Sequence, residues 1–455
     1  MNLAEKLSEY ASGLDYGDLG PRTVKETKRR IVDALGCALG SFNEPPVRIA
    51  RKVLSQGGRG GASTLLGTST RTSPDVATFV NGLMIRYFDF NDTYLSKEPA
   101  HPSDNLGATL SVAESVGATG KELILATALG YEVQCRLCDA ADIRHRGWDH
   151  VCYGLVSSAL AAGKLMGLSA RKMTESVNIA LNAHIAMRQV RAGELSMWKG
   201  ASFANAARNA VFATMLAGAG MTGPSPIFEG EMGFFKQVSG PFEINTEDFG
   251  GRRGVFKIDE TYIKYFPAEY HSQTAVWAAL EVRKRIGGVS DIEAVEIASH
   301  EAGYTILGRD PEKWRPKTKE TADHSLPYIV GMALLEGKVD NSTYSARKTT
   351  KKETLDFIDK ITVVEDPRLT ALYPHEGMGN RVTVRLRSGG QVSEEVIIPR
   401  GHPRNPMSDE EVENKFRGLT RGKLSRKAEG RVLHSLWNLE NAKNIGNLTR
   451  MLRAD

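Results

Sequence analysis

The chain has 455 residues, of which 41% are hydrophobic and 25% are charged, so it is long enough for two domains and has the composition of a globular protein. Its net charge of +5 is small beside 59 basic and 54 acidic side chains, which argues against a nucleic-acid binder. Four cysteines are too few for a disulfide scaffold, and no apolar run reaches the length of a membrane span.

The first 250 residues are expected to be all-helical. Leu3, Leu7 and Tyr10 recur at helical spacing, and the stretch around them carries acids but lacks the apolar run of a signal peptide. We therefore expect a cytoplasmic protein that does not enter the membrane. The glycine-rich residues 57–63 lack the lysine of a phosphate loop and follow a helix, which predicts a turn. Further helices are predicted at residues 46–55, 74–87, 104–118, 121–140, 151–167, 170–187 and 202–220.

The pattern changes after about residue 267. Helices are predicted at residues 273–286 and 324–336, strands at 292–297 and 361–364, and a β-hairpin at 382–398 that turns at Ser388-Gly389-Gly390. After residue 400 the chain is helical again, and Ser408 with Glu411 forms a capping box. The fold class is therefore mainly α. A large all-helical domain is made from both chain ends, residues 1–267 and 401–455, with a smaller α+β lid domain inserted at residues 268–400.

Polar side chains gather in residues 86–113, which read RYFDFNDTYLSKEPAHPSDNLGATLSVA. Asp89, Thr93 and His101 lie there beside segments that are predicted to be buried helices. Imidazoles and carboxylates are the usual proton-transfer groups of enzymes. The alternative is structural, because acids at helix ends often act as caps and a loop histidine is often hydrogen-bonded to its surroundings. The residues alone leave both interpretations open.

Three further side chains stand beside small-residue helices or a domain boundary. His150 precedes a helix rich in Ala, Gly and Ser, where the helix dipole favours the neutral imidazole. Lys199 lies between Trp and Gly, and Lys264 lies at the predicted boundary of the lid. A lysine in such a place can hold a substrate carboxylate, although most lysines are solvated surface charges.

Two more candidates lie in the predicted hinge and lid. His271 belongs to KYFPAEYHSQ, and Tyr328 belongs to DHSLPY, where His324 could simply cap the helix. Cys135 and Cys138 form a single C-x-x-C pair without further ligands nearby, so no metal is expected.

These segments together resemble the MmgE/PrpD family, which includes 2-methylcitrate dehydratase and cis-aconitate decarboxylase. The resemblance rests on D-x-x-D-T followed by H-P-S-D-N, on W-K, on K-x-x-P-A-E-x-H-x-Q and on H-S-x-x-Y. It implies a helical domain with a lid, an active site beside the lid and a homodimer formed through the helical domain. It also implies roles for eight residues: catalytic for Asp89, His101, His150 and Tyr328, and substrate-binding for Thr93, Lys199, Lys264 and His271.

The expected function is a lyase that needs no cofactor. Two lysines, several histidines and an acid suit a small di- or tricarboxylate and the removal of a proton next to a carboxylate. With the resemblance, this predicts a dehydratase for 2-methylcitrate or a related tricarboxylate. Decarboxylation of cis-aconitate and epimerisation of a dicarboxylate are alternatives on the same fold. A non-catalytic carboxylate-binding protein and an iron–sulfur hydratase are alternatives of other classes.

Overall fold

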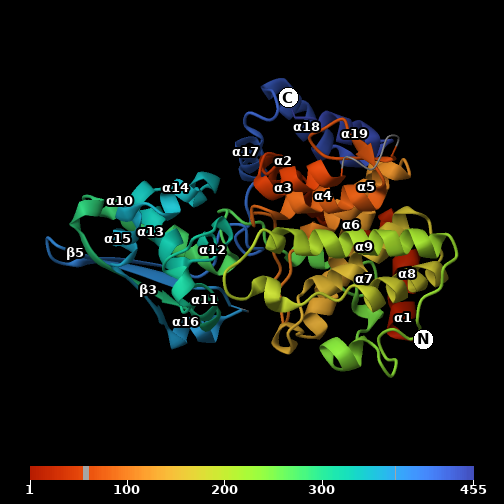
Figure 1. Cartoon of the computed structure of the whole chain (residues 1–455), viewed down its shortest axis with the longest axis horizontal. Helices are drawn as coiled ribbons and strands as arrows, with labels where there is room; N and C mark the ends of the chain where they lie inside the picture. The colour runs from red at the N-terminus through yellow and green to blue at the C-terminus, as the bar shows by residue number, and fades with distance from the viewer. Residues whose placement is uncertain (55–60, 375, 455) are drawn as a thin grey trace.

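The fold is given by a computed structural model of the chain, which describes residues 1–54, 61–374 and 376–454. Residues 57–60 of the predicted glycine-rich turn lie outside the described residues. Figure 1 shows two parts, a large helical part and a smaller part that contains a sheet.

The large part is built from helices that come from both ends of the chain. In Figure 1 the C-terminal helices lie beside α2 and α3, and α17 packs against α2. The N-terminal set comprises α1 (Leu3–Gly13), α2 (Pro21–Gly40), α3 (Pro45–Leu54), α4 (Pro74–Arg86), α5 (Leu106–Ser115), α6 (Gly120–Ala140), α7 (Val151–Leu165), α8 (Ala170–Ala183) and α9 (Trp198–Gly218). The C-terminal set comprises α17 (Asp409–Thr420), α18 (Arg426–Trp437) and α19 (Ile445–Met451).

Small residues let the central helices approach closely. A Cβ atom on Gly107 of α5 would lie 2.8 Å from the Cα atom of Gly82 in α4, a distance that side chains do not tolerate. A Cβ on Gly82 would in turn lie 3.2 Å from the Cβ of Ala204 in α9. The capping box predicted before α17 is present, because the Ser408 side chain accepts from the Glu411 backbone and the Glu411 side chain accepts from the Ser408 backbone.

The smaller part carries a four-stranded sheet with the order β4-β3-β5-β6. Strands β3 and β4 are parallel, whereas β5 pairs antiparallel with both β3 and β6, so the predicted hairpin is confirmed. The strands are β3 (Ile292–Ser299), β4 (Ile361–Glu365), β5 (Asn380–Leu386) and β6 (Gln391–Val396). The helices are α10 (Gln273–Arg285), α11 (Glu301–Leu307), α12 (Lys319–Ala322), α13 (Leu326–Glu336), α14 (Ala346–Thr349), α15 (Lys352–Ile358) and α16 (Pro367–Leu372).

Buried apolar side chains form two large clusters. The members of one cluster lie within residues 3–263 and 407–452, and the members of the other lie within residues 266–384. The predicted mainly α fold class is confirmed. The predicted division into a helical domain and a lid domain, with boundaries at residues 268 and 400, stays a prediction. None of the helices in the described ranges combines the length and the hydropathy that a membrane crossing requires.

Some local predictions differ from the structure. The helix predicted from residue 104 begins at Leu106, after a short 3₁₀ turn at Pro102–Asn105. Helix α9 begins at Trp198, four residues before its predicted start, so Lys199 lies in its first turn. A two-residue ladder joins β1 (Ser63–Thr64) to β2 (Arg71–Thr72) in a region expected to be helical throughout. Strands of two residues are too short for an alternating pattern to reveal them.

Candidate active site

The turn after α4 places a buried carboxylate at the centre of the candidate site. Asp89 is only 2% exposed and has a φ of 51°, in the left-handed region where Asp is among the few side chains tolerated. The turn brings the Asp89 carboxylate back onto the guanidinium of Arg86, the last residue of α4, and the two form an ion pair.

Two lysines from distant segments reach the same carboxylate. Nζ of Lys264 lies 3.0 Å from Oδ1 of Asp89 and also donates to its main-chain oxygen at 2.8 Å. Nζ of Lys199, on α9, lies 3.4 Å from Oδ2. Burial alone would raise the pKa of Asp89, but Arg86 and the two lysines hold it well below its ordinary value. Burial lowers the pKa of Lys199 to about 8, against the attraction of Asp89.

His101 presents a free basic nitrogen beside this cluster. Its Nδ1 lies 2.8 Å from the main-chain oxygen of Asp92. A carbonyl oxygen only accepts, so Nδ1 carries the hydrogen of the neutral ring and Nε2 carries the lone pair. Burial, and then the charges of Arg86 and Lys264, hold the pKa of His101 well below its ordinary value. Nε2 lies 4.0 Å from Oδ1 of Asp89. The ring of His101 is therefore neutral at pH 7, and its unprotonated Nε2 lies beside the cluster.

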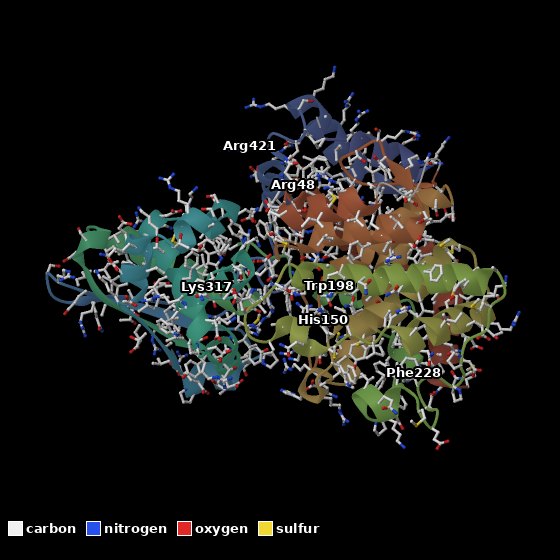
Figure 2. All side chains as sticks on the ribbon, viewed as in Figure 1. Arg48, His150, Trp198, Phe228, Lys317 and Arg421 are labelled. Carbon is white, nitrogen blue, oxygen red and sulfur yellow. The ribbon has the colours of Figure 1, made fainter. Side chains whose placement is uncertain are left out.

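A second histidine lies next to the first. Figure 2 places His150 in the helical part, and its ring centroid lies 5.9 Å from that of His101. Its Nδ1 lies 2.8 Å from Oδ1 of Asp149, whose Oδ2 lies 3.1 Å from Nε of Arg191. Nε2 of His150 is buried and has no hydrogen-bond partner among the described residues. Burial lowers the pKa of His150 although Asp149 opposes this, so its ring is also neutral at pH 7.

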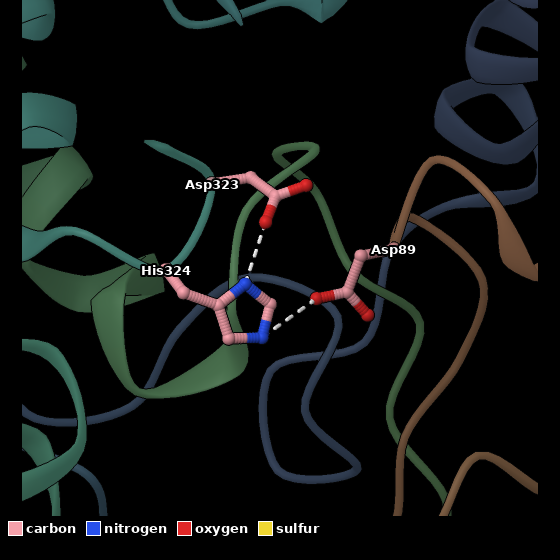
Figure 3. Close-up of side chains that lie close together, drawn as sticks. All are labelled: Asp89, Asp323 and His324. Atoms are coloured by element: carbon pink, nitrogen blue, oxygen red, sulfur yellow. Dashed lines mark hydrogen bonds and ion pairs between the residues drawn. The ribbon is translucent and has the colours of Figure 1, made fainter. Parts of the chain in front are cut away.

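The smaller part adds an acid and a histidine that sequence reasoning left out. Nε2 of His324 lies 3.5 Å from Oδ2 of Asp89, and its Nδ1 lies 2.5 Å from Oδ1 of Asp323. Figure 3 shows His324 between the two carboxylates. Nζ of Lys319 lies 2.8 Å from Oδ2 of Asp323. Burial lowers the pKa of His324 to about 4. The adjacent Asp and His of the DHSLPY segment were the signal for this contact, whereas the prediction selected Tyr328.

Asp89, Asp323 and His324 could also be considered as metal ligands, because one ligand atom from each lies within 4.8 Å of the others. The charges around them do not fit a resident cation. Lys264 and Lys199 contact the carboxylate of Asp89, and Lys199 also lies 3.9 Å from Oδ1 of Asp323. A divalent ion would have to displace or approach these ammonium groups at short range. We interpret the cluster as an ion-pair network.

Thr93 is a predicted site residue that acts within the network in a way that the sequence did not indicate. The hydroxyl of Thr93 donates to the main-chain oxygen of Ala100 at 3.0 Å, and thereby ties the loop that carries His101. The main chain of Thr93 also pairs with Tyr262, two residues before Lys264. Its predicted contact with substrate stays a prediction.

The remaining two predicted residues make their contacts within the smaller part. Nδ1 of His271 lies 2.8 Å from Oε1 of Glu269, and its Nε2 lies 3.1 Å from the hydroxyl of Tyr373. The Tyr328 hydroxyl donates to the main-chain oxygen of Thr343 at 2.6 Å. No contact of either side chain with Asp89 is found among the described residues. Their roles in catalysis and binding stay predictions.

The comparisons with known proteins agree with the motifs. The MmgE/PrpD N-terminal domain matches residues 5–247, and the MmgE/PrpD C-terminal domain matches residues 266–440. A 2-methylcitrate dehydratase of Salmonella typhimurium is 30% identical over 401 residues, which cover 82% of this chain and 81% of the relative. A cis-aconitate decarboxylase of Mus musculus is 28% identical over 476 residues, which cover 99% and 93%. The chain therefore belongs to the MmgE/PrpD family.

Proposed function

We propose that the protein is a cofactor-independent hydro-lyase that removes water from 2-methylcitrate or a related tricarboxylate. The observation that carries this proposal is the neutral His101, whose basic Nε2 faces a buried cluster of cations around Asp89. Dehydratases of 2-methylcitrate are among the relatives that align with more than four-fifths of the chain.

In the proposed reaction, Nε2 of His101 removes the proton from the carbon next to a substrate carboxylate. The electron pair of that bond forms the carbon–carbon double bond, and the hydroxyl on the neighbouring carbon leaves as water after it gains the proton that His101 took up. The ammonium groups of Lys199 and Lys264 stabilise the negative charge that develops on the carboxylate. His150 is the second proton-transfer group of this proposal: its Nε2, which is buried and has no hydrogen-bond partner among the described residues, accepts that proton from His101 and passes it to the hydroxyl.

The charge of the cluster suits a substrate with several carboxylates. Four cations, Arg86, Lys199, Lys264 and Lys319, surround the two carboxylates of Asp89 and Asp323. The positive excess attracts an anion, and burial strengthens that attraction because the local dielectric is low. An anionic substrate would replace part of the existing ion-pair network.

The proposal is tested by proton NMR of the purified protein with 2-methylcitrate, citrate and cis-aconitate in deuterated water. Loss of water from 2-methylcitrate, with deuterium entering carbon only on reversal, is the expected result. Loss of carbon dioxide from cis-aconitate would instead establish the decarboxylase, the second candidate, which is favoured by the alignment of the mouse relative with 99% of the chain. Folded protein that turns over none of the three would contradict the proposal.

The pH dependence follows from the charge on Lys199. Its ammonium form is required, and burial lowers its pKa to about 8 in the free protein. Because kcat/KM reports ionisations of the free enzyme, kcat/KM should fall as the pH rises through about 8. Lys199→Arg keeps the charge at high pH, so this alkaline limb should move upward by at least one pH unit. An unchanged limb in the variant would assign the ionisation to another group.

We also propose a homodimer formed through the helical part, and its support is a set of exposed apolar side chains on α9. Trp198, Phe212 and Met215 are 52%, 48% and 38% exposed there. Phe212→Glu should convert the dimer to a monomer in light scattering coupled to size exclusion. Val53→Glu, on the exposed side of α3, should leave the dimer intact. A wild-type monomer would contradict the proposal.

The cytoplasmic location stays a prediction.

A further inference from the structure

Lys415, on α17, joins the two chain segments that carry Asp89 and Lys264. Its Nζ donates to the main-chain oxygens of Phe90 and Lys264, each at 2.7 Å. The third partner is Oδ1 of Asp33 on α2, at 2.6 Å. Lys415 thus makes two hydrogen bonds to main-chain oxygens and one ion pair. Lys415 and Asp33 are buried, with side chains 5% and 0% exposed.

The two carbonyls lie immediately beside the candidate catalytic groups. Phe90 follows Asp89, whose left-handed backbone needs support from its surroundings. Lys264 supplies its own main-chain oxygen to Lys415 and its side chain to Asp89. Both lysine side chains therefore link the segment of Asp89 to the segment of Lys264. Nζ of Lys415 also lies 3.7 Å from the ring centroid of Phe90, a cation–π contact.

We propose that Lys415, with Asp33 as its counter-ion, is a positioning residue for the reaction of this site. It fixes the Asp89 carboxylate relative to the Lys264 ammonium without touching substrate. The kinetic test of this inference rests on the proposed function. Without the ammonium, two buried carbonyls lose their donor and the turn at Asp89 loses its tether. A displacement of about 1 Å in such a constellation can lower the rate about 100-fold.

A second lysine, which is partly buried, provides a matched control. Lys28, on α2, donates to the main-chain oxygen of Trp437 at 2.8 Å and to the carboxylate of Glu440 at 2.9 Å. It therefore joins α2 to the C-terminal region, as the pair of Lys415 with Asp33 does. Its partners do not adjoin Asp89 or Lys264 in the sequence. Loss of Lys28 should destabilise the helical part without moving the site.

The experiment compares Lys415→Met with Lys28→Met. Lys415→Met should lower kcat about 100-fold and change KM less than about threefold, whereas Lys28→Met should keep kcat within about twofold of wild type. Both should lower the melting temperature. Asp33→Asn, which removes the counter-ion and keeps the shape of the side chain, should also lower kcat. Equal kcat losses in the two lysine variants, or a wild-type kcat in Lys415→Met, would overturn the inference.

A rescue experiment separates the missing ammonium from a general loss of folding. Lys415 lines a cavity of about 580 Å³, so a small amine can reach its place. Propylammonium replaces the atoms that Lys415→Ala removes beyond Cβ, and it should restore at least a tenth of the lost kcat. Propanol, which has the same length without the charge, should restore none. Equal effects of the two additives would overturn the inference.

A readout without turnover separates this inference from the proposed function. Hydrogen–deuterium exchange in peptides that cover residues 86–93 and 262–266 should rise in Lys415→Met and stay at the wild-type level in Lys28→Met. If wild-type protein fails to dehydrate a tricarboxylate, the proposed function is wrong, and the exchange result still decides the positioning role. Unchanged exchange in Lys415→Met would overturn that role.

Discussion

His101→Asn is expected to lower kcat about 1,000-fold while the protein remains folded and binds citrate with nearly unchanged affinity. Removal of a general base typically lowers the rate by about 100- to 10,000-fold. The asparagine amide can still donate to the main-chain oxygen of Asp92, as Nδ1 of His101 does. The change therefore removes the basic Nε2 and keeps the contact that orders the loop. Turnover by NMR and citrate binding by calorimetry measure the two effects separately.

The matched control for this variant is His145→Asn. The His145 side chain is 75% exposed, so its replacement should leave both turnover and binding unchanged. A His101→Asn protein that loses melting temperature and activity in parallel would favour a structural histidine. Citrate binding without any turnover in the wild-type protein would favour a non-catalytic carboxylate-binding protein over the lyase.

Asp89→Asn is expected to lower the free energy of unfolding by about 3–5 kcal/mol, the usual cost of removing one partner from a buried ion pair. The side chain is 2% exposed and faces the cations of Arg86, Lys199 and Lys264, which lose their shared counter-charge. Asparagine tolerates the left-handed backbone at this position, so the cost comes from charge and not from strain. Chemical denaturation at pH 7 measures it.

Asp104→Asn is the matched control for the loss of a buried carboxylate. Oδ2 of Asp104 lies 3.6 Å from Nε of the same arginine, Arg86. Burial raises the pKa of Asp104 to about 7, although Arg86 opposes the rise. Its carboxyl is therefore close to half protonated at neutral pH, and an amide should replace it at a smaller cost. An Asp89→Asn protein as stable as Asp104→Asn would contradict a shared counter-charge at Asp89.

An anionic ligand should reduce the defect of Asp89→Asn. Citrate brings carboxylates to a cluster that has lost one, so saturating citrate should raise the melting temperature of Asp89→Asn more than that of wild type. A rise in wild type that exceeds the rise in the variant would show that citrate does not bind at these cations. Differential scanning fluorimetry with and without citrate gives both values.

Local patterns in the sequence determined much of the fold. Helical spacing of apolar residues predicted most helices to within a few residues, and the glycine turn after β5 predicted the hairpin. These elements obey short-range rules, because a helix or a hairpin is specified by residues that are close in the chain. The sequence motifs that resemble the MmgE/PrpD family also marked five candidates that lie around one buried cluster. They are Asp89, His101, His150, Lys199 and Lys264.

Only the tertiary structure decided which side chains complete that cluster. His324 reaches Asp89 from the smaller part, and Lys415 reaches the neighbouring main chain from α17. Tyr328, favoured by its motif, instead donates to Thr343 within the smaller part. Spacing along the chain marks some of these residues, such as the adjacent Asp323 and His324, but does not show which side chains meet. These contacts depend on where two separately packed cores meet, and on which buried ammonium and carboxylate groups must find partners when water is excluded.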